Sequence, residues 1–286
     1  MVPKISACVF TKDNNIGAFG LWESVASLMP FADEYLIMDL GSTDGTLETL
    51  KDLASRNPKI RLEHSSFYKL DNSIFADLAN DMIAMCKNEI IICHQADEIW
   101  HEDLLETMRS EFEKIDVSNL DAWQGMGFWR YQLRDNFQKM KWWPHLVNLV
   151  DLKSRFKFVG DGMNSSHGCP TVGNVGSQTN WQEDFKGRAH EIPTNQMILD
   201  IGMIGGFLNV IPTRRRLHAP IWGESPEVIY IDGKAENLEA WYNAERGNQD
   251  WFATETPFNI PEIMRGHLGK LTYKPRADVL DRIARG

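Results

Sequence analysis

Two short acidic segments follow apolar stretches and carry the side chains best suited to chemistry. The first reads D-L-G-S-T-D-G-T at residues 39–46, after the apolar residues 35–38. The second reads H-Q-A-D-E at residues 94–98, after an isoleucine-rich stretch. Carboxylates in such places can accept hydrogen bonds from a ribose or a base, or bind a hard divalent cation together with substrate phosphates. The alternative is that both segments are ordinary polar loops.

The residues around Asp39 fit two interpretations, a loop that binds a polar ligand and an ordinary junction between a strand and a helix. A carboxylate at the end of a buried strand is costly without a partner, so Asp39 is a candidate hydrogen-bond acceptor for a ligand. Gly41 permits a tight turn with positive φ, and Ser42 and Asp44 are good caps for the helix that follows. The segment is therefore either a well-made junction between a strand and a helix, or such a junction that also binds a ligand.

The elements that must position these residues follow from the hydrophobic pattern. Strands are expected at residues 5–10, 35–38, 60–62 and 89–94, and helices at residues 16–28, 46–54, 74–85 and 103–112. This alternation is typical of parallel β-α-β units with right-handed crossovers. Ligands of such sheets bind at the carboxyl ends of the strands, which directs attention to the loops at residues 11–13, 39–46, 65–71 and 95–100.

Composition limits the class of protein. The 286 residues include 30 Lys and Arg against 40 Asp and Glu, and the net charge of −10 argues against a protein that coats nucleic acid. The four cysteines show no CxxC spacing and are expected to be buried free thiols in a reducing compartment. The chain shows neither a signal-peptide core nor an apolar run that could span a membrane, so we expect a cytoplasmic protein.

The N-terminal part of the chain resembles glycosyltransferase family 2, whose members have the GT-A fold and transfer a sugar from a nucleotide-sugar donor. Its most specific match is the D-x-x-S-T-D-G-T element at residues 39–46, whose first aspartate contacts the nucleoside in the family. The resemblance implies that Asp39, Gly41, Ser42 and Asp44 bind the sugar donor, and that the loop of Thr11, Lys12 and Asp13 holds the base.

The same resemblance implies the fold and its division. The fold expected is an α/β fold of the GT-A type, with a Rossmann-like mixed, mainly parallel sheet flanked by helices. Residues 1–120 would form the core that binds the nucleotide sugar, and residues 121–286 a C-terminal, acceptor-side region continuous with it.

The resemblance also places a divalent metal, Mn²⁺ or Mg²⁺, at the second segment. Gln95, Ala96 and Asp97 take the place of the family's D-x-D motif and would bind the sugar donor. Gln95 stands where the family has its first aspartate, which removes one anionic ligand. The expected result is weaker metal binding, or a ligand that comes from elsewhere in the chain. Asp97 is then the expected metal ligand, with Glu98 assisting. His218, in an H-x-x-x-x-G stretch, is a further candidate because imidazole binds such ions.

An inverting transfer needs a general base for the acceptor hydroxyl. Glu191 lies in a G-x-x-H-E element similar to one in the family and is the first candidate. Asp161, and Asp184 in an E-D dipeptide, are the alternatives.

The function expected is therefore a metal-dependent, inverting glycosyltransferase that uses a UDP-sugar and a hydroxyl acceptor such as a saccharide. One rival is a transferase that acts on modified bases in viral DNA, which the acidic net charge disfavours. A second is an inactive module that binds a nucleotide sugar or a glycan, which the neutral Gln95 allows. A nucleotidyltransferase is disfavoured because no Gly-rich phosphate loop with a basic residue stands near the N-terminus.

Overall fold

The computed structural model describes residues 4–17, 20–65, 74–88, 90–113, 262–264 and 275–286, together with the backbone of short strands between residues 126 and 254. Among these residues, no helix has the length and apolar composition that crossing a membrane requires. The described cysteines Cys8, Cys86 and Cys93 are free thiols.

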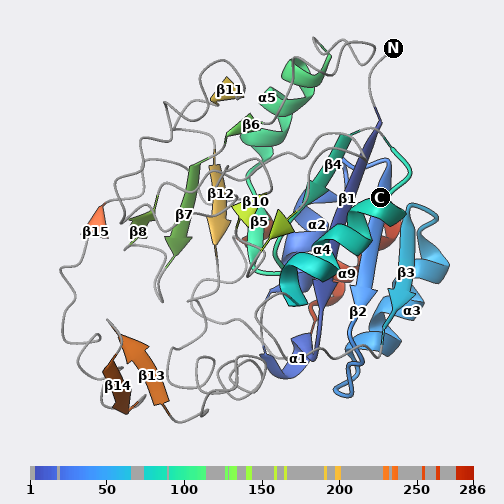
Figure 1. Cartoon of the computed structure of the whole chain (residues 1–286). Helices are drawn as coiled ribbons and strands as arrows, with labels where there is room; N and C mark the ends of the chain where they lie inside the picture. Colours follow the sequence, from blue (N-terminus) through green and yellow to red (C-terminus); the bar gives the residue numbers. More distant parts are fainter. Residues whose placement is uncertain are drawn as a thin grey trace.

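A parallel four-stranded sheet forms the centre of the N-terminal half (Figure 1). Its strands are β1 (Ile5–Thr11), β2 (Glu34–Asp39), β3 (Ile60–His64) and β4 (Ile90–Cys93), in the order β3-β2-β1-β4. All three neighbouring pairs are parallel, and Thr11 at the end of β1 stands opposite Asp39 at the end of β2. The sheet confirms the expected fold and brings the carboxyl ends of the strands to one edge, the lower edge in Figure 1.

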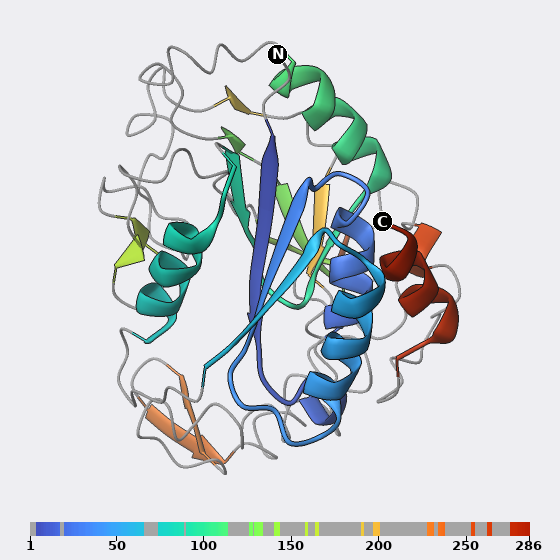
Figure 2. The same ribbon diagram turned by 90° about the vertical axis from the view of Figure 1, so that its right-hand side faces the viewer.

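Helices cover both faces of this sheet (Figure 2). The helix α4 (Ile74–Met85) lies on one face, and α2 (Leu21–Leu28), α3 (Thr46–Arg56) and α9 (Ala277–Arg285) lie on the other. The helix α5 (Glu102–Phe112) follows at the margin of the second layer. Helices on both faces explain why β1, β2 and β4 are largely apolar and buried. The edge strand β3 instead alternates, with Ile60 and Leu62 each followed by a charged residue.

Alternate strand residues point to opposite helical layers. Ile5, Ala7 and Val9 of β1 belong to the apolar cluster that contains residues of α2, α3 and α9, whereas Cys8 packs with residues of α4. By the same alternation, Thr11 faces the layer of α2 and α3 at the carboxyl edge of the sheet.

The single helix expected at residues 16–28 is wrong. Two helices occur instead, α1 (Asn14–Gly17) and α2, and Gly20 directly before α2 has the left-handed φ of 82°. Such a backbone cannot continue a right-handed helix, and glycine adopts it without steric cost. The side-chain oxygen of Asn14 accepts the N–H of Leu21 at 3.1 Å and so caps the start of α2.

The loop expected at residues 95–100 is shorter than predicted, because β5 (Glu98–Trp100) begins within it. This strand pairs antiparallel with β12 (Met197–Asp200) at the edge of a five-stranded sheet of order β15-β8-β7-β12-β5. The partner strand lies about a hundred residues away in the sequence, so local patterning gave no sign of the pairing. The other strands of this sheet are β7 (Trp129–Leu133), β8 (Met140–Trp143) and β15 (Ala253–Thr254).

Three short pairs complete the described strands. They are β6 (Met126–Gly127) with β11 (His190–Glu191), β9 (Phe158–Val159) with β10 (Asn164–Ser165), and β13 (Val228–Ile231) with β14 (Lys234–Asn237). A 3₁₀ turn, η3 (Glu262–Met264), packs against α2. The expected division of the chain at residue 120 remains a prediction.

Candidate functional site

Asp39 is fully buried at the carboxyl end of β2. Its Oδ2 accepts the N–H groups of Gly41 and Ser42, both at 3.0 Å, and lies 3.2 Å from Nδ1 of His64. Gly41 has a φ of 81°, the left-handed conformation that lets the chain fold back over the carboxylate. The second oxygen, Oδ1, finds no hydrogen-bond partner among the described residues.

The hydroxyl of Thr11 is in the same situation. Thr11 is 3% exposed, and its Oγ1 also lacks a hydrogen-bond partner in the described part of the chain. Thr11 and Asp39 are paired in the register of β1 and β2, and side chains of paired residues in neighbouring strands project to the same face of a sheet. The carboxyl edge therefore holds two buried polar atoms on one face of the sheet, and neither has a hydrogen-bond partner among the described residues.

Asp13 connects the loops that follow β1 and β2. Its N–H donates to Oγ of Ser42 at 2.8 Å, and its Oδ1 accepts the N–H of Thr43 at 2.7 Å. Asp13 has a φ of 47°, which is uncommon outside glycine but tolerated by aspartate. The sequence assigned Asp13 to the base, whereas in the structure one of its carboxylate oxygens holds the neighbouring loop.

Lys12 and Asp44 also have defined partners in these loops. The ammonium of Lys12 donates to the carbonyl oxygens of Leu40 and Gly41, both at 3.4 Å. The carboxylate of Asp44 accepts the N–H of Thr46, the first residue of α3, at 3.0 Å. Gly45, rather than Asp44, stands directly before α3, and the carboxylate of Asp44 accepts the first N–H of the helix from one residue further out.

The turn that carries Asp97 is closed by its own backbone and by Glu98. The N–H of Glu98 donates to the carbonyl oxygen of Gln95 at 3.2 Å, and the N–H of Gln95 donates to Oε2 of Glu98 at 3.0 Å. Glu98 is 2% exposed, Asp97 is half-buried and Gln95 is exposed. Glu98 thus holds the turn together, a role that the sequence did not predict for it.

Two histidines beside these loops were missed as site residues in the sequence. His94 is buried and in contact with Tyr35, Ser24 and the carbonyl oxygen of Gln95. Burial lowers the pKa of His94 to about 4, against the opposing effect of its hydrogen bond to Gln95. His64 contacts Asp39. The position of each histidine at or next to the carboxyl end of an expected strand was the available signal.

The topology brings three of the predicted loops to one edge. The loops of residues 11–13, 39–44 and 95–97 follow β1, β2 and β4, and β1 lies between the other two strands. Two strand spacings amount to roughly 10 Å, a span that a diphosphate nucleoside can bridge. That Asp39 and Asp97 line one pocket remains a prediction.

The remaining predicted site residues lie mostly beyond the described part of the chain. Glu191 is in β11, which pairs with β6, and only its backbone is described. Asp161, Asp184 and His218 lie outside the described residues. Their roles remain predictions.

The described residues do not form a complete metal site by themselves. Among them, no group of three or more His, Cys, Asp or Glu side chains is arranged to hold an ion. Mg²⁺ and ions like it are commonly held by one or two carboxylates together with substrate phosphates and water. The chemistry of the Asp97 carboxylate fits an ion of this kind when a diphosphate supplies the other oxygens.

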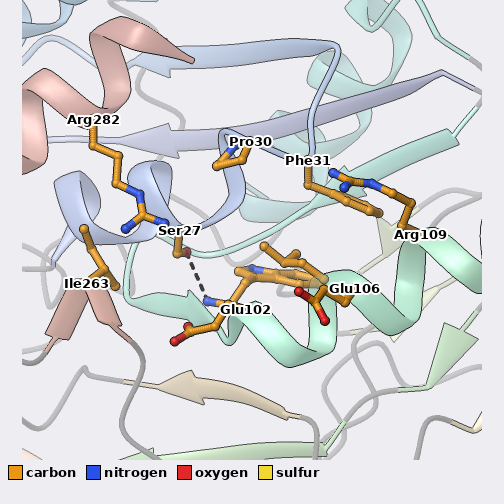
Figure 3. A pocket seen from close by; sticks show the side chains of 10 residues that line it. Ser27, Pro30, Phe31, Glu102, Glu106, Arg109, Ile263 and Arg282 are labelled. Atoms are coloured by element: carbon orange, nitrogen blue, oxygen red, sulfur yellow. Dashed lines mark hydrogen bonds between the residues drawn. The ribbon is translucent and has the colours of Figure 1, made fainter.

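A separate cavity of about 150 Å³ lies between α2, α5, η3 and α9 (Figure 3). Phe31, Arg109 and Arg282 are among the side chains that line it, and Arg109 lies over the ring of Phe31. Ser27 and Pro30 in its wall lie where α2 leads towards the start of β2, near the amino edge of the sheet. This cavity is therefore distinct from the predicted donor site.

The chain matches the profile of Glycosyl transferase family 2 over residues 20–171, more than half of its length. The chain therefore belongs to glycosyl transferase family 2. The match includes β2, β4 and the turn of Asp97, and it extends beyond the four-stranded sheet. A comparison with proteins of curated function gave no match.

Several solved structures are similar to the chain. The mannosyltransferase PcManGT from Pyrobaculum calidifontis, in complex with GDP-Man and Mn²⁺, is 15% identical with a TM-score of 0.43, over 100% of this chain and 74% of that one. S. aureus TarS 1-349 in complex with UDP is 12% identical with a TM-score of 0.37, over 76% of this chain and 64% of that one. Two further TarS structures are matched over 35% and 39% of their own length. Similarities of this size carry no conclusion about the sugar donor or the acceptor.

Proposed function

We propose that the chain is a glycosyltransferase that moves a sugar from a nucleotide-sugar donor to a hydroxyl acceptor. The observation that carries the proposal is the pair of buried atoms Thr11 Oγ1 and Asp39 Oδ1, which lack partners among the described residues. A buried carboxylate oxygen without a hydrogen bond is costly, and a ligand that donates one recovers that cost. The pair lies at the carboxyl edge of a parallel sheet, where such sheets bind nucleotides.

The nucleotide is proposed to be UDP. Uracil offers an N–H and ribose offers hydroxyls, and either can donate to the carboxylate of Asp39. The hydroxyl of Thr11 can donate to a carbonyl oxygen of the base. Gly41, Ser42 and Asp44 support this arrangement through the loop whose N–H groups Asp39 holds.

The diphosphate is proposed to lie against the turn of residues 95–97, with Mn²⁺ or Mg²⁺ held by Asp97. Such an ion supplies positive charge that stabilises the leaving diphosphate. Lys12 adds a fixed positive charge after β1, between the two loops. His218 is proposed as a further ligand of the ion.

The transfer is proposed to invert the configuration of the sugar. A carboxylate removes the proton of the acceptor hydroxyl while its oxygen attacks C1 from the face opposite the diphosphate, and the bond from C1 to the diphosphate oxygen breaks. Glu191 is the first candidate for this base, and Asp161 and Asp184 are the alternatives. The acceptor is proposed to be a saccharide rather than DNA, since the net charge is −10.

Thermal-shift measurements with a panel of UDP- and GDP-sugars in MnCl₂ test the proposal. Binding to the folded state raises the melting temperature, so the correct sugar donor should raise that of the wild type by several degrees. Asp39→Asn should lose most of the rise, because an amide cannot accept at both positions. Asp97→Ala should lose the part that depends on Mn²⁺ and also the transfer activity, with its fold intact.

Asp52→Asn is the matched control, since Asp52 is an exposed carboxylate on α3. It should respond to the sugar donor as the wild type does. Transfer by Asp97→Ala at the wild-type rate would refute its assigned role. An unchanged response of Asp39→Asn would refute the nucleoside site.

A second candidate function is a module that binds a nucleotide sugar without transferring it. The exposed, neutral Gln95 at the position of the family's first metal-binding aspartate favours it. Hydrolysis of the bound sugar donor in Mn²⁺ separates the two, because water can replace the acceptor in an active transferase. Binding without hydrolysis or transfer would favour the module.

A further inference from the structure

A chain of hydrogen bonds from three elements meets the turn that carries Asp97. Its central member is His94, which follows β4 and is 4% exposed. Nε2 of His94 lies 2.6 Å from the hydroxyl oxygen of Tyr35 in β2, and the two rings meet edge to face. Nδ1 lies 2.9 Å from the carbonyl oxygen of Gln95 and 3.2 Å from Oγ of Ser24 in α2.

The partners of His94 determine its tautomer. A carbonyl oxygen only accepts, so Nδ1 carries the proton that it donates to Gln95. Nε2 of the neutral ring is then an acceptor, and the hydroxyl of Tyr35 donates to it. Because burial holds the pKa of His94 near 4, the ring keeps this form at neutral pH. The direction of every bond in the chain is thereby fixed.

The backbone of Gln95 is held on both sides. Its carbonyl oxygen accepts from His94, from the hydroxyl of Ser24 at 3.3 Å and from the N–H of Glu98. Its N–H donates to the buried carboxylate of Glu98. Six polar groups are therefore paired with one another at a turn whose first side chain, that of Gln95, is itself exposed.

We propose that Tyr35, Ser24 and His94 are positioning residues that orient the turn so that Asp97 meets the metal ion and the diphosphate of the sugar donor. The inference rests on the proposed function, in which Asp97 holds the metal. In the proposed function Asp97 is the metal-binding side chain of this turn. Its position then depends on the groups that hold the turn, because small displacements of a binding group weaken the interaction steeply. Tyr35 of β2 and Ser24 of α2 supply those groups around His94 and the turn.

The alternative is that the chain only stabilises the fold, and a second buried serine allows a matched control. Ser6 lies near the opposite end of β1, and its hydroxyl donates to Glu34 at 2.6 Å. Ser6→Ala and Ser24→Ala each remove one buried hydroxyl from the same half of the molecule. Only Ser24 touches the turn of Asp97.

The test measures the affinity of Ser24→Ala, Tyr35→Phe, Asp97→Ala, Ser6→Ala and the wild type for UDP and for GDP by calorimetry. Each titration is run in MnCl₂ and again in EDTA, and the ratio of the two affinities reports the contribution of the metal. Ser24→Ala and Tyr35→Phe should each lower the ratio roughly tenfold, as the loss of one buried hydrogen bond at the turn implies. Asp97→Ala should bring the ratio to unity, and Ser6→Ala should keep the wild-type ratio even where its melting temperature falls.

The outcomes separate this inference from the function on which it rests. Wild-type ratios in Ser24→Ala and Tyr35→Phe, with the ratio lost in Asp97→Ala, would overturn the positioning role and leave the proposed function standing. Wild-type protein that binds neither nucleotide, or binds without response to Mn²⁺, would overturn the role of Asp97 and this inference with it. If Tyr35→Phe fails to fold, Ser24→Ala decides alone.

Discussion

Asp39, at the end of β2, and Glu98, at the start of β5, are two buried carboxylates that the protein uses differently. Glu98 is bound by the N–H of Gln95 in its own turn. Asp39 holds its loop through Oδ2 alone, and its Oδ1 lacks a partner among the described residues. Buried polar groups are normally satisfied, so the unpaired Oδ1 supports the proposed role of Asp39 in binding the sugar donor.

At the residue scale, His94 should make the stability of the protein depend on pH. Its pKa is about 4 in the folded state and about 6.5 in the unfolded state, so folding favours the neutral ring. The stabilisation is complete above pH 6.5 and is lost as the pH falls towards 4, by an amount on the order of 3 kcal/mol. Urea denaturation between pH 7.5 and 4.5 measures it.

Two variants test whether His94 causes this pH dependence of the free energy of unfolding. His94→Gln removes the titrating ring and should flatten the dependence between these limits, whatever its effect on stability at pH 7.5. Tyr35→Phe keeps the ring buried and should retain the slope. A slope that survives in His94→Gln would show that other groups cause it.

At the scale of elements, Glu34 joins the amino ends of three strands. Its carboxylate accepts from Ser6 of β1, from Arg61 of β3 at 2.8 Å and from the N–H of Lys87 after α4. Burial of the carboxyl opposes ionisation, but these hydrogen bonds and the charges of Arg61 and Lys87 outweigh it and lower the pKa of Glu34. The network fixes the sheet at the edge opposite the candidate site.

Glu34→Gln should therefore lower the free energy of unfolding at pH 7 by about 1–3 kcal/mol, because a neutral amide is a weaker acceptor for these groups. The pKa of Glu34 is depressed in the folded state. The stabilisation by its ionised carboxylate is therefore complete above the pKa of the unfolded chain, and it is lost as the pH falls through the lower pKa of the folded protein. Denaturation at pH 7 and at pH 3 should show the largest difference between variant and wild type at pH 7. Equal differences at both values would contradict the ionic part of the argument.

The helix α2 holds the segment that carries Asp97 through two of its residues. All eight of its residues are buried, including the polar Ser24 and Ser27. The hydroxyl of Ser27 accepts the N–H of Trp100 in β5 at 3.1 Å, while Ser24 contacts the turn before that strand. The helix thus holds the chain after β4 at two points, one on each side of Asp97.

At the scale of the whole molecule, the C-terminal helix completes the core of the N-terminal half. Ile283 and Val279 of α9 are fully buried in the cluster that contains α2 and α3. The side-chain amide of Asn57, directly after α3, donates to the carbonyl oxygen of Ile283 at 2.6 Å. Residues at the two ends of the chain therefore form one hydrophobic unit.

Ile283→Ala should lower the free energy of unfolding by about 2–5 kcal/mol, the usual cost of removing a large side chain from a packed core. Denaturation of the full chain measures it. Arg285→Ala is the control on the same helix, since Arg285 is 83% exposed, and its effect should be small. Near-wild-type stability of Ile283→Ala would show that α9 is not part of the core.

The class of fold and most elements of the N-terminal half could be predicted from the sequence. The strand at residues 5–10 and the helices at residues 74–85 and 103–112 were expected within one residue of their observed bounds. Their signals are local, because a buried strand or an amphipathic helix shows in the spacing of its own apolar residues. The break at Gly20 was missed since a single glycine has no such periodic signal.

The sequence by itself determined which residues stand at the ends of strands, and so that Thr11, Asp39 and Asp97 would share one edge of a parallel sheet. Only the tertiary structure decided which atoms at this edge the protein itself engages. Asp13 and Glu98 hold loops, and Asp39 keeps one oxygen without a partner among the described residues. Ser24 contacts the turn of Asp97 directly, and Tyr35 contacts it through His94. The physical reason is that local periodicity fixes the direction of a side chain, whereas a hydrogen bond depends on which distant segments the strand order brings within about 3 Å.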